Sequence, residues 1–176
     1  LQRIADSTDR ASHLITQLLS LARAEASFEK LYAVEQVDIE AMVRDVALEL
    51  FARAQAKGID LGVEESGCVP PIEGNPVLLR ELVKNLLDNA IKYTPRGGRV
   101  TARTRIAGAV VVEIEDTGIG IPEADREQVF ERFYRVPGSG ADGSGLGLPL
   151  VREIAALHRP TLPPHPNTSG PGTTAP

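Results

Sequence analysis

Residues 81–95 read Glu-Leu-Val-Lys-Asn-Leu-Leu-Asp-Asn-Ala-Ile-Lys-Tyr-Thr-Pro, and this stretch decides the fold. Its apolar residues recur at the three-and-four spacing of a helix that packs one face on a core; with Leu79 they are Leu82, Val83, Leu86, Leu87, Ala90 and Ile91. A second row, at i, i+4, i+8 and i+11, consists of Glu81, Asn85, Asn89 and Lys92. The stretch therefore predicts a helix with one apolar and one polar face.

Two asparagines one turn apart are unusual within a helix, because the Asn side chain competes with the backbone for hydrogen bonds. Amide oxygens are hard, neutral ligands that suit Mg²⁺, and a lysine one turn further on offers a point charge for phosphate oxygens. A polar surface stripe would explain the same row. The helix alone leaves both interpretations open.

Composition narrows the class of protein. The 176 residues can form one well-filled domain with an appendage, and the net charge of −5 with scattered Lys and Arg argues against a nucleic-acid footprint. Cys68 is the single cysteine, which excludes an internal disulfide and fits a reducing compartment. No apolar run approaches the roughly 20 residues of a membrane span, so we expect any membrane attachment to lie outside this chain.

The first segment, residues 1–26, predicts an amphipathic helix with a heptad stripe. The stripe is wider than a two-stranded seam needs and suits a four-helix bundle. A lone helix of this kind must find a partner helix upstream or in another subunit.

The segments between that helix and the central one alternate in character. The sequence predicts a polar connector, a helix capped by Asp38 and ended by Gly58, a strand, and a loop rich in Pro and Gly, at residues 27–36, 38–58, 59–63 and 67–74. Asn75-Pro76 opens the central helix.

Two alternating segments, residues 100–106 and 110–116, predict strands joined by a tight turn at Ala107-Gly108. The even-numbered residues of the second strand are apolar until Asp116 ends it, so this carboxylate points to the same face as Ile114. A carboxylate on a core face is costly unless it has partners.

Two interpretations of Asp116 remain. It bonds the Thr117-Gly118 turn that follows, or it accepts a hydrogen bond from a ligand amine while Gly118 and Gly120 let the ligand approach the backbone. The run Asp-Thr-Gly-Ile-Gly-Ile-Pro favours the second.

A glycine-rich loop precedes the last helix. Residues 129–135, Val-Phe-Glu-Arg-Phe-Tyr-Arg, interleave arginines with aromatic residues, and residues 136–144 carry little apolar surface. Gly-Ser-Gly-Leu-Gly-Leu, residues 143–148, then enters an amphipathic helix predicted over 150–158. Such a loop at a helix N-terminus makes an anion site from backbone N–H groups.

Four motifs in this order resemble the N, G1, F and G2 boxes of bacterial sensor histidine kinases. They are Asn-Leu-Leu-Asp-Asn-Ala-Ile-Lys-Tyr-Thr, Asp-Thr-Gly-Ile-Gly-Ile-Pro, Phe-Glu-Arg-Phe-Tyr-Arg and Gly-Ser-Gly-Leu-Gly-Leu. The likeness extends over residues 1–158 and is closest to the QseC-like group, with the first helix resembling the second helix of the dimerisation and phosphotransfer domain. It implies an α+β fold, a two-layer α/β sandwich of the Bergerat (GHKL) type behind a bundle-forming helix, with ATP and Mg²⁺ as cofactors.

The resemblance also implies a role for each motif residue. Asn89 and Asn85 would serve the metal, Lys92 phosphate, Tyr93 and Asp116 the adenine, Gly118 and Gly120 the purine pocket, Arg132 and Arg135 the phosphates, and Gly143, Gly145, Leu146 and Gly147 the lid. The gyrase, Hsp90 and MutL types carry a glutamate general base where Asn85 stands. An amide cannot take that proton, so the sequence favours phosphoryl transfer over hydrolysis.

Two departures from the family pattern stand out. The phosphoacceptor histidine of the family lies on the first bundle helix, which we expect upstream of residue 1, so the chain resembles a kinase core without a catalytic acceptor of its own. Residues 160–176 are rich in proline where the family has two more strands, so we expect a tail that does not pair as strands and is disordered, leaving a marginally stable chain that binds ATP weakly.

The predicted organisation is part of a dimerisation bundle at residues 1–27, an ATP-binding domain at 36–159 and the tail at 160–176. The first functional hypothesis is a histidine kinase core that is homodimeric through the bundle, passes phosphoryl groups to a response regulator receiver domain, and forms the cytoplasmic portion of an inner-membrane sensor. The second is a nucleotide-binding or dimerisation module without catalysis. The third, disfavoured by Asn85, is a hydrolytic ATPase.

Overall fold

The computed structural model describes residues 33–67, 69–137, 144–158, 165–166 and 173–174. Contacts divide the chain into two units, residues 1–34 and 35–176, and the fold below is that of the second unit. The predicted first helix, Cys68 and Gly143 lie outside the described residues.

The main sheet has three strands in the order β2-β4-β5, which are Asp60–Glu64, Arg99–Ile106 and Val110–Asp116. Strand β2 runs parallel to β4, and β4 runs antiparallel to β5 through a tight turn with Gly108 at φ 75°. A separate antiparallel pair joins β1, Glu35–Val37, to β3, Ile72–Gly74. The sheet is therefore mixed.

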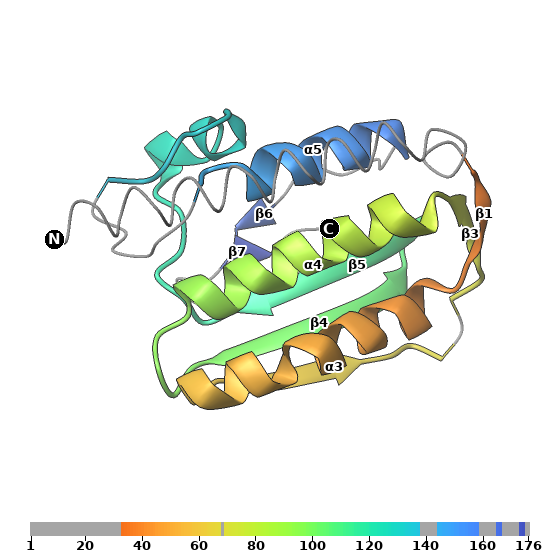
Figure 1. Ribbon diagram of the computed structural model, residues 1–176, viewed down its shortest axis with the longest axis horizontal. Coiled ribbons are helices and arrows are strands. Elements are labelled where there is room, and N and C mark those ends of the chain that lie inside the picture. Colours follow the sequence, from red (N-terminus) through yellow and green to blue (C-terminus); the bar gives the residue numbers. More distant parts are fainter. Residues whose placement is uncertain (1–32, 68, 138–143, 159–164, 167–172, 175–176) are drawn as a thin grey trace, which may run out of the picture. The chain divides into compact units, whose positions relative to one another are not determined.

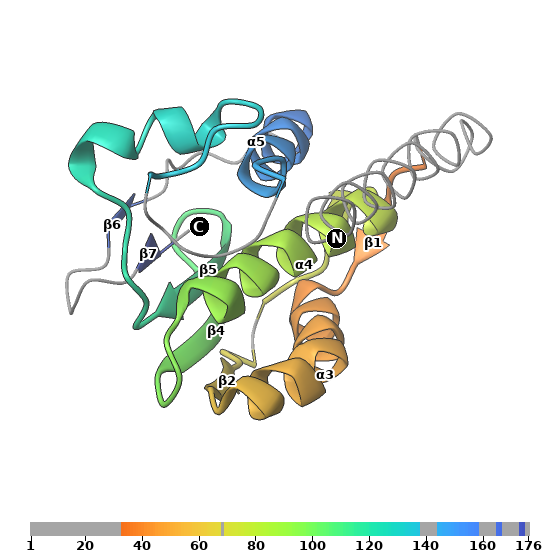
Figure 2. The same cartoon turned by 60° about the vertical axis from the view of Figure 1, so that its left-hand side comes forward.

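Three helices accompany the sheet: α3 (Ile39–Lys57), α4 (Pro76–Tyr93) and α5 (Gly147–Leu157). The cap residues predicted for the first two are confirmed: Asp38 accepts from the Ala41 N–H at 3.0 Å, Gly58 ends α3 in the left-handed conformation, and Asn75 accepts from the Leu78 N–H at 2.9 Å. Helices α3 and α4 lie on one face of the sheet, and α5 packs beside α4 (Figures 1 and 2).

The core lies between these two layers. The apolar stripe predicted on α4 is buried there, with Leu87 fully enclosed and Val83 and Ile91 at 1 % exposure. Val100 and Ala102 of β4 and Val151 of α5 belong to the same cluster. This arrangement confirms the predicted two-layer α/β sandwich.

Several local predictions are wrong. Residues 35–37 and 72–74 form strands where a connector and a loop are expected. The prediction failed because each strand has only three residues, too few to show alternation, and each gains its hydrogen bonds from the other. Ile106 is 55 % exposed at the end of β4 and does not continue the buried face. After Pro122 the chain forms two 3₁₀ turns, η1 (Glu123–Asp125) and η2 (Gln128–Phe130).

The expectation that the tail does not pair as strands is also wrong. His165–Pro166 (β6) and Thr173–Thr174 (β7) form an antiparallel pair, and β7 lies against β5. A two-residue ladder needs few backbone donors, so it tolerates a proline that a longer central strand would exclude. The other tail residues lie outside the described ranges.

The end of α5 is tied to the start of α4 through His158. Its Nε2 accepts the backbone N–H of Asn75 at 3.0 Å, and its Nδ1 lies 2.9 Å from the carbonyl oxygen of Ile154. Because a carbonyl can only accept, these two bonds assign the proton to Nδ1. A Cβ at Gly74 would lie 2.9 Å from the His158 ring, so the contact requires glycine there.

Candidate functional site

The polar row of α4 meets the first residue of α5. The Asn85 Nδ2 group donates to the Glu81 carbonyl at 2.8 Å and to its carboxylate at 3.2 Å, which sets the orientation of the amide. A Cβ on Gly147 would lie 3.2 Å from Asn85 Oδ1 and 3.3 Å from Asn89 Nδ2. The two carboxamides therefore lie directly beside the N-terminus of α5, where only a residue without a side chain fits easily.

This N-terminus is suited to bind an anion. Helix α5 begins without a side-chain cap: Leu146, its N-cap residue, has an apolar side chain and makes no hydrogen bond to the first N–H groups of the helix. They carry the positive end of the helix dipole. Two neutral carboxamides and the positive end of a helix dipole thus lie side by side.

A second group of residues gathers at the end of β5. Asp116 is 8 % exposed, and its Oδ1 accepts the Gly118 N–H at 2.8 Å. A Cβ on Gly118 would lie 2.6 Å from that oxygen and 2.8 Å from the Tyr93 carbonyl oxygen. The bond to the turn expected from the first interpretation of Asp116 is present, and it orients the carboxylate that the second interpretation requires.

Helix α4 links the two groups. Lys92 places its Nζ 4.9 Å from the centre of the Tyr93 ring, a cation–π contact in the last turn. The Ile119 N–H donates to the Tyr93 carbonyl at 3.4 Å, and Gly120 adopts a left-handed φ of 68°. Helix α4 therefore carries the two amides, the lysine and the tyrosine in succession. The turn after Asp116 contacts the C-terminal end of this helix.

The segment rich in arginine and aromatic residues contacts α5. Arg132 is exposed and donates to Glu153 at 2.6 Å, and this carboxylate raises the pKa of the guanidinium. Arg135 is exposed. Arg132 thus faces a partner on α5 rather than the amides of α4.

A backbone contact holds the arginine- and aromatic-rich segment, residues 129–135, against the glycine-rich loop before α5. Phe133 has an unusual φ of 67° for a residue with a side chain, and its N–H donates to the Gly145 carbonyl at 2.9 Å. Gly145 has φ 70°, and a Cβ there would meet the Phe133 carbonyl carbon at 2.7 Å. The Tyr134 hydroxyl donates to Asp125, which raises the pKa of Tyr134.

Sequence reasoning missed two residues that contact this site. Glu153 pairs with Arg132 from 21 positions away, and the sequence around Glu153 gives no signal that predicts this partner. Lys57 reaches the last turn of α4 from α3. Its position just before Gly58 marks it as a helix-ending cation, a signal too common to assign it to a site.

The sheet face that points away from the core cluster holds a hollow of about 330 Å³, lined by residues of β2, β4 and β5 and by Thr117 next to Asp116. Arg103 lies in it and bonds Glu64 at 2.5 Å and Glu115, and these carboxylates raise its pKa. Because these charged side chains pair with one another across neighbouring strands, we infer that they stabilise the sheet.

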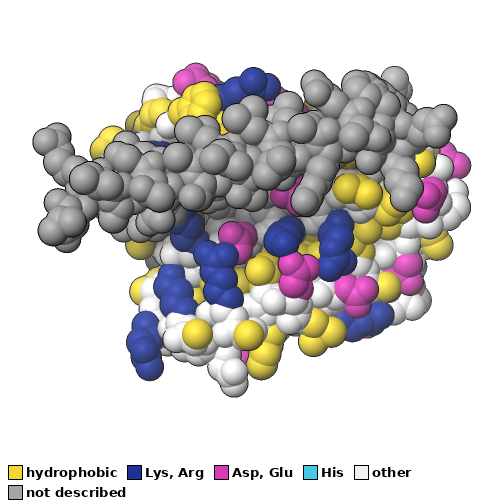
Figure 3. Space-filling model, viewed as in Figure 1, with side chains coloured by type: hydrophobic (Ala, Val, Ile, Leu, Met, Phe, Trp, Pro, Cys, Tyr) yellow, Lys and Arg dark blue, Asp and Glu magenta, His cyan; other side chains and the backbone are white. Residues whose placement is uncertain are grey.

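Charges also intermingle on the opposite face. Figure 3 shows basic and acidic side chains next to one another over α3 and α4. Among the helices of the described part, none is both long and apolar enough to cross a bilayer.

Comparison with known proteins connects this site to a family. The family model described as "Histidine kinase-, DNA gyrase B-, and HSP90-like ATPase" matches residues 74–175, which includes both groups of site residues and the tail. The sensor protein QseC of Salmonella typhi is 38 % identical over 154 residues, covering 88 % of this chain and 33 % of that protein. The chain thus spans about a third of the length of that relative.

Solved structures agree with the sequence comparison. The cytoplasmic segment of histidine kinase QseC matches with a TM-score of 0.63 and 26 % identity, covering 94 % of this chain and 90 % of that one. Full-length ShkA in complex with AMPPNP matches with a TM-score of 0.71 and 31 % identity, covering 90 % of this chain and 34 % of that one.

Proposed function

This chain belongs to the family of histidine kinase-, DNA gyrase B- and HSP90-like ATPases, and on that premise we propose that it is the ATP-binding catalytic core of a two-component sensor histidine kinase. The core would bind ATP with Mg²⁺ and direct the γ-phosphoryl group to a histidine on a bundle helix. A response regulator would then receive it. The similarity to sensor kinases over 88 % of the chain supports this assignment.

The residues present fit Mg²⁺ and phosphate. Asn89 and Asn85 offer amide oxygens, Lys92 offers a cation on the same face, and Gly147 keeps the α5 N-terminus within reach of both amides. ATP supplies the group to be transferred and most of the negative charge. The chain supplies neutral metal ligands and donors, so its contribution is positioning and charge neutralisation.

The residues at the end of β5 fit a purine. The Asp116 carboxylate would accept a hydrogen bond from the exocyclic amine of adenine, and Gly118 leaves the backbone open on that side. Tyr93 would pack near the ring. Guanine has no amine at the equivalent position, so this pocket should prefer adenine.

The observation that carries the choice of kinase over hydrolase is Asn85. Its side chain is an amide whose Nδ2 is already engaged with Glu81, so it cannot remove a proton from water. Glu81, the nearest carboxylate, accepts a hydrogen bond from that amide. The arrangement favours holding the nucleotide for transfer to another nucleophile.

The organisation of the whole protein follows as part of this proposal. Residues 1–27 would form part of a dimerisation and phosphotransfer bundle, with the protein homodimeric, in the cytoplasm and anchored to the membrane through segments outside this chain. The ATP-binding domain would start near residue 36. We extend it beyond residue 159, because the family match continues to residue 175 and β7 lies against β5.

The decisive experiment measures ATP binding by the purified chain with and without Mg²⁺, and then phosphotransfer to a supplied bundle helix that carries an acceptor histidine. We expect Mg²⁺-dependent binding and phosphohistidine formation with little release of inorganic phosphate. Rapid hydrolysis without transfer would contradict the kinase assignment. Absence of nucleotide binding would contradict the function as a whole.

A further inference from the structure

Lys57 occupies a position in α3 that differs from those of its neighbours in the same row. Glu49, Arg53 and Lys57 lie one turn apart and all face α4. The first two reach charged side chains on α4, whereas Lys57 reaches backbone. Its Nζ donates to the carbonyl oxygens of Ile91 at 2.8 Å and Lys92 at 2.6 Å.

These two bonds complete the C-terminus of α4. The last four carbonyls of a helix have no partner within it. Here the Ala90 carbonyl accepts the Thr94 N–H at 3.0 Å, the next two accept Lys57, and the Tyr93 carbonyl accepts the Ile119 N–H at 3.4 Å. The lysine charge also offsets the negative end of the helix dipole, where burial lowers the pKa of Lys57.

This last turn is where the two groups of site residues meet. Lys92 and Tyr93 belong to it, and Gly118 packs against the Tyr93 carbonyl so closely that a Cβ would lie 2.8 Å away. The end of α3 is held to the same place, because the Gly97 N–H donates to the Gly58 carbonyl at 2.9 Å. Any fraying of the last turn of α4 would therefore move the phosphate-facing lysine and the Asp116 turn together.

We propose that Lys57 is a positioning residue of the nucleotide site, which holds the last turn of α4 in the register that Lys92, Tyr93 and the Asp116 turn need to bind ATP. The inference rests on the proposed function. Lys57 touches backbone rather than nucleotide, so it acts through the residues it positions. No motif of the sequence includes it.

The test compares Lys57→Met with Lys57→Arg and with Lys84→Met, the last being a matched control that removes a lysine of α4 paired with an exposed glutamate. Calorimetric titration with Mg²⁺-ATP and Mg²⁺-GTP measures affinity well below each melting temperature. We expect Lys57→Met to weaken ATP binding about tenfold, because small displacements of binding groups are costly, and to reduce the preference for ATP over GTP. Lys57→Arg should restore most of both, and Lys84→Met should change neither.

Amide hydrogen exchange provides a second readout without nucleotide. The Thr94 and Ile119 amides should exchange faster in Lys57→Met, while amides in the middle of α4 stay protected; if the variant folds too poorly for titration, Lys57→Gln takes its place. A lower melting temperature with unchanged ATP affinity, unchanged ATP preference and unchanged exchange would show a purely structural role and overturn the inference. An unaltered chain that binds no nucleotide would instead overturn the proposed function, and this inference with it.

Discussion

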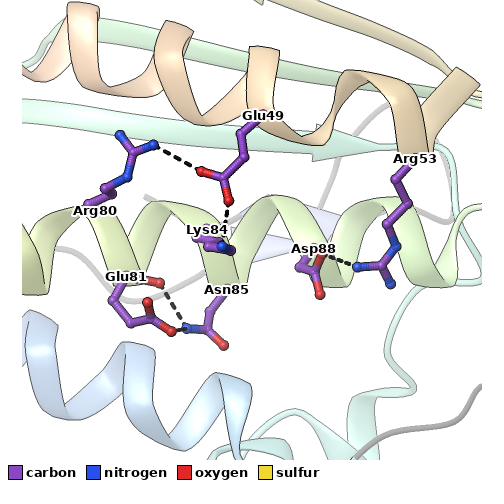
Figure 4. A network of polar contacts seen from close by, with 7 residues as sticks. All are labelled: Glu49, Arg53, Arg80, Glu81, Lys84, Asn85 and Asp88. Atoms are coloured by element: carbon purple, nitrogen blue, oxygen red, sulfur yellow. Dashed lines mark hydrogen bonds and ion pairs between the residues drawn. The ribbon is translucent and has the colours of Figure 1, made fainter. Parts of the chain in front are cut away.

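The two polar edges of α4 differ in what their side chains contact (Figure 4). The α3 edge, consisting of Arg80, Lys84 and Asp88, is engaged with α3: Glu49 accepts from Arg80 at 2.9 Å and from Lys84 at 2.5 Å, and Arg53 pairs with Asp88. The amide edge consists of Glu81, Asn85, Asn89 and Lys92, and Figure 4 shows its members Glu81 and Asn85 on the side of α4 away from α3. The Asn85 amide bonds Glu81 within α4, and both amides lie beside Gly147 of α5.

This difference separates packing from binding on one helix. Ion pairs between exposed side chains of neighbouring helices contribute little to stability because water and salt screen them, so the α3 edge should tolerate substitution. Amides that bond their own helix and border an uncapped helix start gain little for stability. We therefore expect these amides to serve a ligand. The following predictions test this contrast, from the largest expected effect to the smallest.

Asn89→Ala should weaken Mg²⁺-dependent ATP binding by about 100-fold or more, because the substitution removes the amide oxygen that we propose as a metal ligand. The matched control is Asp88→Ala, the adjacent residue on the α3 edge, which should leave ATP affinity unchanged. Calorimetric titration with and without Mg²⁺ compares the two. Equal ATP affinities in the two variants would contradict the claim that the amide edge, and not the α3 edge, binds the nucleotide.

Asp116→Asn should weaken ATP binding by one to two decades, because leaving a buried polar group without its partner costs on the order of 1 to 3 kcal/mol and 1.4 kcal/mol is one decade. The unaltered chain should prefer ATP to GTP, and the variant should lose that preference. Competition titration with both nucleotides measures it. Equal affinity of the unaltered chain for the two nucleotides would remove Asp116 from the adenine pocket.

Glu153→Gln should raise ATP affinity by about threefold, because a neutral amide holds the Arg132 guanidinium less strongly than a carboxylate does. The substitution weakens the hold on Arg132 and frees it for phosphate. Glu127→Gln, on the exposed turn before η2, is the control. An unchanged ATP affinity in Glu153→Gln would mean that Arg132 does not reach the nucleotide.

Glu49→Gln should have the smallest effect: unchanged ATP affinity and a melting temperature lower by at most about 3 °C at pH 7. Hydrogen bonds from Lys84 and then Arg80 lower the pKa of Glu49 in the folded chain. Its contribution is therefore complete above the unfolded value of 4.5 and is lost as the pH falls through the lower folded pKa.

Thermal unfolding between pH 7 and pH 3 checks the sign. The difference in melting temperature between Glu49→Gln and the unaltered chain should shrink below about pH 4.5. A difference that persists or grows there would show that the α3 edge does not depend on this carboxylate charge.

The sequence predicts most of this fold because its strongest signals are local. The apolar and amide rows of α4 are periodic within one helix, and the caps Asp38 and Asn75 act three residues away. The position of Asp116 at a strand end follows from alternation within a single strand. The ligand roles of the motif residues remain predictions.

Features that depend on partners far away in the sequence could not be predicted from these local signals. The β1–β3 pair joins two three-residue segments that lack alternation, and Arg132 finds Glu153 on another element. The tail gives a similar example. Its proline content predicts that it does not pair as strands, yet β6 and β7 form a ladder with only two residues each. Local composition does not reveal what a segment gains from its neighbour.

The bond between His158 and Asn75 makes the imidazole a natural spectroscopic reporter. With the proton on Nδ1 and Nε2 accepting from the backbone, the two ring nitrogens should give well-separated ¹⁵N resonances. The chain contains only three histidines, so this signal can be assigned with few substitutions. Because α5 begins beside the amide edge and ends at His158, nucleotide-driven movement of that helix could be followed in solution without attaching a label.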